Sequence, residues 1–162
     1  MIHKKRGDFV ERIVDTQAYL DMVCQLLSEG KTEVPVPVKG VSMRPFLRDG
    51  DRVFLEKPGQ MVRPGDIVLY TRPNGQYVLH RIYRVNPNGS FWIIGDSQTT
   101  LEPVAGMSQI HAKVSYVIAG GKTVKPGDFR WWFYACPWRV LAPWRRQISR
   151  IREFIRRPKN GK

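Results

Sequence analysis

The sequence predicts a mainly β protein, in which an amphipathic helix precedes a compact antiparallel β body and a basic, aromatic, helical tail follows it. Three observations support this fold class. Apolar residues recur at helical spacing near the start, short β-type runs separated by turn residues fill the middle, and tryptophans and arginines gather near the end. A chain of 162 residues has about the size of one ordinary domain. Its 42% hydrophobic and 25% charged residues are typical of a globular protein.

The first 33 residues form the predicted helical segment, domain 1–33. From about Asp8 to Ser28 the apolar side chains are spaced three and four residues apart, as on one face of a helix. Asp8 is a plausible N-cap and Gly30 a C-terminal stop. The apolar positions are Phe9, Ile13, Tyr19, Leu20, Val23, Leu26 and Leu27.

Residues 34–121 form the predicted β domain. Turn sequences at 73–75 (Pro-Asn-Gly) and 86–89 (Asn-Pro-Asn-Gly) separate neighbouring runs and predict at least one hairpin within a meander. The predicted strands are Val34–Val38, Arg52–Glu56, Ile67–Thr71, Tyr77–Val85, Ser90–Ile94 and Ile110–Ala119.

The tail, residues 122–162, holds most of the positive charge. Of the net charge of +13, residues 130–162 contribute ten basic side chains against one acidic residue, Glu153. Aromatic rings beside a polybasic face favour an anionic membrane surface, reached through residues 130–162, and make nucleic acid the less favoured polyanion. The alternative is that the rings pack on the body. Ile148, Ile151 and Ile155 predict a further helix, which Pro158 ends.

Several classes of protein are excluded by the same sequence. The longest stretch without Asp, Glu, Lys or Arg is Val85–Gly95, far short of the roughly 20 residues that a spanning helix needs. Acidic residues interrupt the N-terminus where a secretory signal would be apolar. We therefore expect a cytoplasmic protein, or one peripheral at the cytoplasmic face of the membrane. Cys24 and Cys136 have no metal or redox spacing, and we expect no cofactor and no metal.

Ser42 is the candidate nucleophile. It lies in the segment 40–51, where Gly40 permits a close backbone approach and Pro45 holds Arg44 near extended geometry. A serine hydroxyl needs an adjacent base to react near neutral pH. Serines beside turns are mostly structural, so the assignment of Ser42 as a nucleophile depends on which base the chain can place beside it.

His80 is the candidate base. Strand alternation places it with Val78 and Ile82 on one face of the run 77–85, opposite Leu79, Arg81 and Tyr83. A histidine on an apolar face is more often a structural residue. However, no lysine occurs between Lys57 and Lys113, so the same strand offers no other base.

The order of short motifs resembles the type I signal peptidases and their soluble relatives, the self-cleaving repressors of the bacterial DNA-damage response. His80-Arg81, where bacterial signal peptidases carry lysine, is similar to the His-type branch. The resemblance covers roughly residues 36–120 and implies a signal-peptidase-like β body with Ser42 as nucleophile and His80 as general base. The motifs are Ser42-Met43-Arg44-Pro45, Gly50-Asp51, Gly65-Asp66-Ile67-Val68, His80-Arg81 and Gly95-Asp96.

The resemblance also implies an acidic residue that assists the histidine. Asp96 and Glu102 are both candidates, because either could hold the imidazole in the useful tautomer. It further implies an extended peptide substrate, paired with strand edges near Val34–Val41 and Ile67–Tyr70. An unperturbed imidazole predicts that activity falls on acidification through roughly pH 6–7.

These observations predict a serine endopeptidase that cleaves a leader or another precursor. Membrane signal peptidases usually carry an apolar anchor before the serine motif, whereas residues 1–39 here are charged. A self-cleaving transcriptional regulator would normally add a DNA-binding domain, for which one helix is too little. The remaining alternative is a catalytically silent or regulatory membrane-associated module that retains the peptidase fold.

Overall fold

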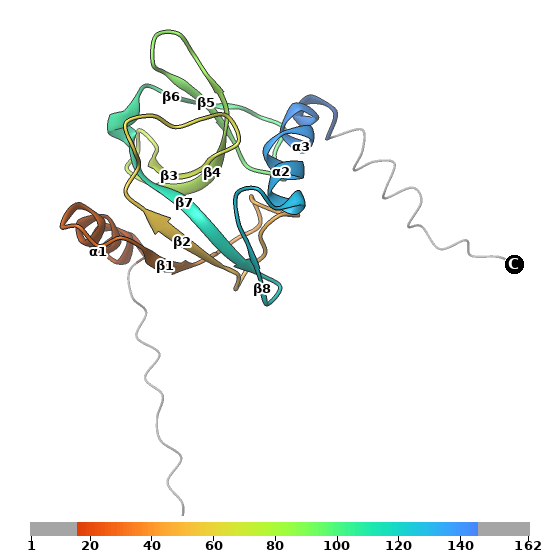
Figure 1. The fold of residues 1–162 in the computed structure, drawn as a ribbon. Coiled ribbons are helices and arrows are strands. Elements are labelled where there is room, and N and C mark those ends of the chain that lie inside the picture. The colour runs from red at the N-terminus through yellow and green to blue at the C-terminus, as the bar shows by residue number, and fades with distance from the viewer. Residues whose placement is uncertain (1–15, 146–162) are drawn as a thin grey trace, which may run out of the picture.

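Eight antiparallel strands form one sheet in the part of the chain that the computed structural model describes, residues 16–145 (Figure 1). This confirms the mainly β fold class. The strands are β1 (Val34–Pro37), β2 (Arg52–Glu56), β3 (Ile67–Thr71), β4 (Tyr77–Val85), β5 (Phe91–Ile94), β6 (Glu102–Val104), β7 (Ile110–Ala119) and β8 (Lys122–Val124).

The strand order is β1-β2-β7-β3-β4-β5-β6, which follows the chain except that β7 is inserted between β2 and β3, and β8 pairs with the end of β7. The ten-residue β7 pairs with β2 along one part and with β3 along another, so it joins the two halves of the sheet. β1 pairs only with β2 and therefore has one free edge. β3 has partners on both sides.

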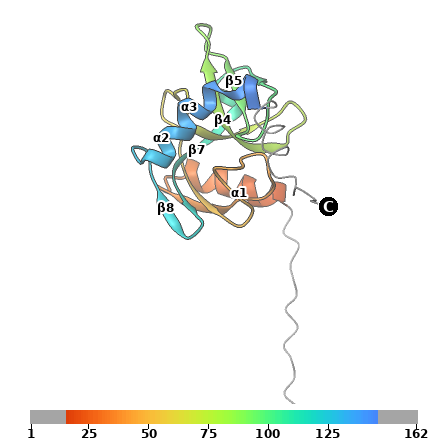
Figure 2. The same cartoon turned by 90° about the vertical axis from the view of Figure 1, so that its right-hand side faces the viewer.

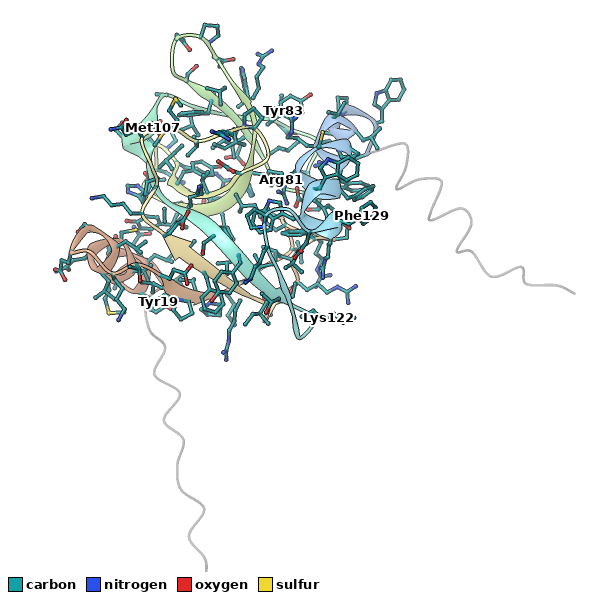
Figure 3. The ribbon with its side chains drawn as sticks, viewed as in Figure 1. Tyr19, Arg81, Tyr83, Met107, Lys122 and Phe129 are labelled. Atoms are coloured by element: carbon teal, nitrogen blue, oxygen red, sulfur yellow. The ribbon has the colours of Figure 1, made fainter. Side chains whose placement is uncertain are left out.

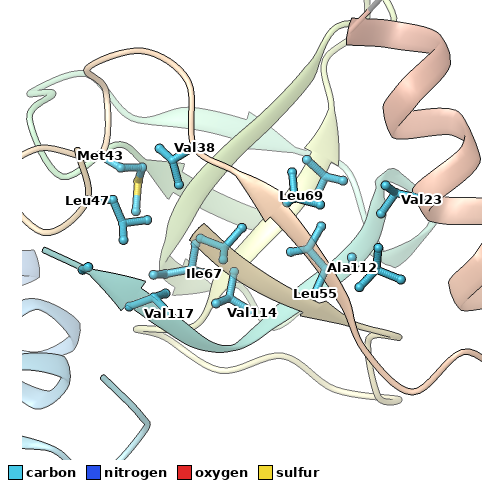
Figure 4. Packing of buried hydrophobic residues seen from close by; sticks show 14 of the residues in the cluster. Val23, Val38, Met43, Leu47, Leu55, Ile67, Leu69, Ala112, Val114 and Val117 are labelled. Atoms are coloured by element: carbon cyan, nitrogen blue, oxygen red, sulfur yellow. The ribbon is translucent and has the colours of Figure 1, made fainter. Parts of the chain in front are cut away.

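The larger of two hydrophobic clusters lies between β1, β2, β3, β7 and the segment after β1 (Figure 4). Its fully buried members include Phe46, Leu55 and Ile67. A smaller cluster contains Val68, Ile82 and other side chains of β3 to β7. Val78 packs against the smaller cluster and Leu79 against the larger one, as the predicted alternation of β4 requires.

The N-terminal helix α1 (Thr16–Ser28) packs its apolar face on the larger cluster through Leu20, Val23 and Leu27. It ends at Ser28, two residues before Gly30, whose φ of 99° lies in the left-handed region that glycine adopts readily. The predicted beginning of this helix, including Asp8 and Phe9, lies outside the described residues.

The first part of the tail packs on the β body in two short helices, α2 (Phe129–Ala135) and α3 (Pro137–Val140), followed by a 3-10 turn, η2 (Ala142–Trp144) (Figures 1 and 2). Trp131 is buried in the larger cluster, where its ring meets Phe46 edge-on. β8, which falls in the predicted tail segment, pairs with β7. The predicted helix around Ile148, Ile151 and Ile155 lies outside the described residues.

One further short element lies between β6 and β7. A 3-10 turn, η1 (Met107–Gln109), precedes β7.

No helix within residues 16–145 is both long enough and apolar enough to cross a bilayer. The division into domains 1–33, 34–121 and 122–162 stays a prediction.

Candidate active site

Ser42 and His80 line the same cleft, which has a volume of about 930 Å³. One wall comes from β1 and the residues that follow it, and the other from the first half of β4. The floor is apolar, with Leu55 and Leu69 from the sheet. The fold thus brings to one cleft the two side chains proposed as nucleophile and base, which are 38 positions apart in the chain.

Ser42 is held by its own backbone. Its carbonyl oxygen accepts hydrogen bonds from the Ser97 backbone N–H at 2.9 Å and from the Ser97 hydroxyl at 3.0 Å. A Cβ on Gly95 would lie 2.6 Å from the same carbonyl oxygen, so only glycine allows this approach. The side chain of Ser42 is half-buried. Within the described part of the chain, no group accepts a hydrogen bond from the Ser42 backbone N–H.

His80 is almost completely buried, with 1% of its surface exposed. Its Nδ1 lies 3.4 Å from the Tyr70 hydroxyl and 3.7 Å from Oε1 of Glu102. Tyr70 stands on β3, where its neighbour across the pair is Val78, two residues before His80. The Tyr70 hydroxyl is therefore closer to Nδ1 than the Glu102 carboxylate is.

Glu102 is fixed by two side chains from the β3 hairpin. The Tyr70 hydroxyl donates to Oε2 at 2.6 Å, and Arg72 donates through Nε to Oε2 at 2.7 Å and through its terminal nitrogen to Oε1 at 2.5 Å. This bidentate pair is the strong geometry for arginine and a carboxylate. It holds the carboxylate in place beside His80.

The surroundings shift the pKa values of these groups in different directions. Burial lowers the pKa of His80 to about 4, and this effect outweighs the attraction of Glu102, while Arg72 lowers the pKa further. Hydrogen bonding from Arg72 lowers the pKa of Glu102. Burial and the hydrogen bond to Glu102 raise the pKa of Tyr70. Near neutral pH the site therefore holds a neutral imidazole, a carboxylate and a phenol.

Asp96, the other acidic candidate, has a different partner. It is completely buried and forms a two-pronged ion pair with Arg81, at 2.9 and 2.8 Å. Its backbone oxygen accepts a hydrogen bond from the Trp138 indole at 2.8 Å. No described contact joins Asp96 to His80, so Glu102 is the acidic residue that the fold places beside the histidine.

Arg81, labelled in Figure 3, connects its own motif to the Gly65 and Gly95 motifs and to Phe46, which follows the serine motif. Besides Asp96, its guanidinium donates to the Gly65 carbonyl at 2.8 Å and lies 5.0 Å from the centre of the Phe46 ring. The motif His80-Arg81 therefore has a divided role. One residue faces the cleft, and the next ties the Gly65 turn, the Gly95 turn and the serine segment together beneath it.

The other two aspartates of the Gly-Asp motifs stabilise turns. Asp51 accepts a hydrogen bond from the Arg48 N–H at 2.8 Å, and Asp66 accepts one from the Arg63 N–H at 2.9 Å. These local bonds are typical of aspartate in turns.

Residues of the tail also contact Phe46 and the Gly95 turn, which Arg81 joins. Arg130 donates to the Phe46 carbonyl at 2.6 Å, and Arg145 donates to the carbonyls of Gly95 and Gln98, both at 2.9 Å. Several of the basic and aromatic residues predicted to contact either a membrane or the body thus contact the body. Others stay exposed, namely Phe129, Trp132 and Trp144.

Tyr70 and Arg72 were not identified from the sequence as site residues. They follow one another at alternate positions, 30 to 32 residues before Glu102, and only strand pairing brings them beside it. Strand alternation places Tyr70 on the same face of β3 as Val68, and Val68 pairs with His80. This shared face is the sequence signal that could have identified Tyr70. Within residues 16–145, no group of three or more His, Cys, Asp or Glu side chains is arranged to hold a metal ion.

Of the two strand edges expected to bind a substrate, the one near Val34–Val41 is free along β1, and the one at Ile67–Tyr70 is not. Ile67–Tyr70 cannot accept a substrate strand, because β3 is paired with β4 on one side and β7 on the other. The open edges beside Ser42 are instead the outer edge of β1 and the first half of β4, since β5 pairs with β4 only from Arg81 onward. Both edges line the cleft.

Comparison with known proteins gives one family. The family model described as Peptidase S24-like matches residues 4–114, which contain Ser42, His80, Asp96 and Glu102. Neither a curated protein nor a solved structure gives a match to the chain. The match covers more than half of the chain, and the protein therefore belongs to the Peptidase S24-like family.

Proposed function

We propose that the protein is a serine endopeptidase in which Ser42 attacks the peptide bond and His80 is the general base. The observation that carries the proposal is the shared cleft, which places a half-exposed serine and a buried, uncharged imidazole at one surface. Membership of the Peptidase S24-like family supports a peptidase, and the choice of histidine rests on the geometry.

The contacts of His80 support Nε2 as the nitrogen that acts as the base. The single hydroxyl proton of Tyr70 goes to Glu102, its closest acceptor at 2.6 Å. The Tyr70 oxygen is then an acceptor, so Nδ1 of His80 carries the ring proton and donates to it. Nε2 is left with a lone pair, and we propose that it takes the Ser42 proton. Glu102 stabilises the imidazolium that forms, as a triad acid does.

The reaction then follows the order of acyl transfer. Ser42 Oγ bonds to the carbonyl carbon as Nε2 takes its proton, and the negative oxygen is stabilised by the Ser42 backbone N–H, which has no acceptor in the described part of the chain. The C–N bond breaks while His80 returns the proton to the leaving amine. Water, deprotonated by His80, releases the acyl group and restores Ser42.

The substrate is an extended peptide lying between the free edges of β1 and β4. The N–H and the carbonyl of Val38 both form hydrogen bonds with the segment before β2. By strand alternation, the backbone groups of Pro37 and Lys39 therefore point away from β2, toward the cleft. By the same alternation, the backbone of Leu79 points away from β3. A peptide in this position would complete the ladder on both sides. A leader or another precursor segment would supply such a strand.

The test compares wild type with Ser42→Ala on a synthetic random dodecapeptide library at pH 8. New termini are identified by mass spectrometry. We expect cleavages that disappear in Ser42→Ala and remain in Ser108→Ala, a matched serine that is exposed and distant from the cleft. Loss of activity in His80→Gln supports histidine as the base.

A wild-type protein that cleaves no peptide would contradict the peptidase and favour the alternative, a silent or regulatory membrane-associated module with this fold. Cleavage that persists in Ser42→Ala would exclude Ser42 as the nucleophile.

A further inference from the structure

Helix α1 lies across one end of the cleft. Thr16, Tyr19 and Leu20 all line it, and α1 is bonded to Pro35 and Tyr77, which precede Ser42 and His80 along the two walls. Leu20 is buried in the larger cluster, whereas Tyr19 is partly buried and packs against that cluster. The cleft is thus bounded at this end by a helix that the catalytic proposal does not use.

The helix is bonded to both walls of the cleft. The Tyr19 hydroxyl donates to the Pro35 carbonyl of β1 at 3.3 Å (Tyr19 is labelled in Figure 3). On the other side, the Tyr77 hydroxyl of β4 donates to Asp21 at 2.8 Å, and Gln17 donates to the Gly75 carbonyl at 3.3 Å. A helix with polar contacts on both strands is a fixed barrier between them.

The two walls give similar lengths for the open strand edges that lie beyond the helix, on the side of His80 and the serine segment. Along β4, Tyr77 precedes His80 by three residues, which is about 10 Å of extended chain. Along the other wall, Pro35, whose outward carbonyl is taken by Tyr19, precedes Lys39 by four residues, or about 13 Å. About three residues of an extended peptide fit beside these edges.

We infer that α1 is the end wall of the substrate cleft and limits the peptide to about three residues on one side of the bond that is cut. This inference rests on the proposed peptidase function. The preferred substrates are peptides whose chain ends, or turns away, about three residues from that bond. The floor beneath these positions is formed by Leu55 and Leu69, so apolar side chains at alternate positions bind there.

The position of the cuts tests the wall directly. In the random dodecapeptide library, we expect wild-type cleavage to cluster about three residues from one terminus. Thr16→Trp adds bulk at the wall and shifts the cluster to about two residues. Tyr19→Ala removes bulk and shifts it outward. Met22→Ala, on the half-exposed face of the same helix, leaves the pattern unchanged. Cuts spread evenly along the peptides, or unaltered by Thr16→Trp, would overturn the inference.

A binding measurement separates this inference from the catalytic proposal. Immobilised Ser42→Ala protein is incubated with random libraries that carry a bulky fluorophore after spacers of one to six residues at either terminus. We expect capture to rise up to a spacer of about three residues at one terminus and then to stay constant. Thr16→Trp lowers the capture of the three-residue spacer by about tenfold, while its thermal unfolding shows that the variant is folded. If capture does not depend on the spacer length, or if no peptide is captured, the inference that α1 is an end wall is wrong. This holds whether or not the wild type cleaves peptides.

Discussion

At the scale of the residue, the environment of His80 changes the expected pH dependence. An unperturbed imidazole would lose activity through roughly pH 6–7. Burial lowers the pKa of His80 to about 4, and of the two charged groups that face it, Glu102 opposes and Arg72 reinforces this direction. The neutral imidazole, which is the form required of the proposed base, persists at pH values where an exposed histidine would already be charged.

We therefore predict that kcat stays nearly constant from pH 8 to about pH 5 and falls through about pH 4. The measurement is a pH profile of cleavage, with circular dichroism recorded at each pH to show that the protein is folded. A fall centred near pH 6.5 in folded protein would contradict the buried, neutral His80. The same shift affects stability, because the unfolded histidine binds a proton near pH 6.5 and the folded one near 4. This contribution is present above pH 6.5 and is lost as the pH falls from 6.5 to 4.

The Tyr70 hydroxyl is predicted to position the imidazole. Tyr70→Phe removes the acceptor for Nδ1 and leaves the ring, so kcat falls by about five- to thirtyfold, the equivalent of about 1–2 kcal/mol. Tyr116→Phe, which alters a ring stacked on Phe54, is the matched control. The ¹⁵N chemical shifts of His80 in the Ser42→Ala background report the tautomer independently of activity. Unchanged shifts in Tyr70→Phe would contradict a positioning role.

At the scale of the element, the Arg81–Asp96 pair joins β4 to the turn after β5. Both side chains are completely buried, so breaking the pair leaves an uncompensated charge. Asp96→Asn is predicted to lower the free energy of unfolding by about 3–5 kcal/mol. Denaturant unfolding measures this, and the pH profile of the remaining activity keeps its shape. A variant of unchanged stability that lost all activity would instead assign Asp96 to catalysis.

Local patterns predicted the long elements and missed the short ones. The runs 52–56, 67–71, 77–85 and 110–119 were predicted with the observed bounds, because alternation and flanking turns mark them. β6 and β8 have three residues each, too few to show a period. β6 carries Glu102, so its position beside His80 depended on a pairing with β5 that no local pattern contains.

The candidate site shows the same division between local and long-range information. Ser42 and His80 were identified from their motifs. The sequence does not decide between Asp96 and Glu102, because the role of each carboxylate depends on its partners in the fold. Asp96 pairs with Arg81, whereas Glu102 accepts from Tyr70 and Arg72. The partners are 15 to 32 residues away and are brought close by the sheet.

At the scale of the whole molecule, the described part of the tail has both a packed and an exposed side. Trp131 and Arg145 are buried, whereas Phe129 is 75% and Trp132 52% exposed. After Asp128, the chain has ten basic residues and one acidic residue. Exposed aromatic rings within such a basic stretch of sequence favour binding to an anionic membrane surface.

We predict that vesicles containing phosphatidylserine sediment more of the protein than phosphatidylcholine vesicles, and that added salt reduces the difference. Phe129→Ala with Trp132→Ala lowers the bound fraction several-fold. Met61→Ala, which removes an equally exposed apolar side chain outside the tail, has little effect. Equal sedimentation with both lipids would contradict an electrostatic contribution.

The two prolines of β1 have a consequence for the molecule in concentrated solution. Pro35 and Pro37 have no N–H, so the outer edge of this strand presents no donor, and with the Pro35 carbonyl bonded to Tyr19 it presents the carbonyl of Pro37. Two copies of the same edge cannot form a ladder, because acceptor would face acceptor. A peptide with ordinary amides can still donate to the carbonyl of Pro37. The open edge thus resists self-assembly into a continuous sheet while it remains available to a foreign strand.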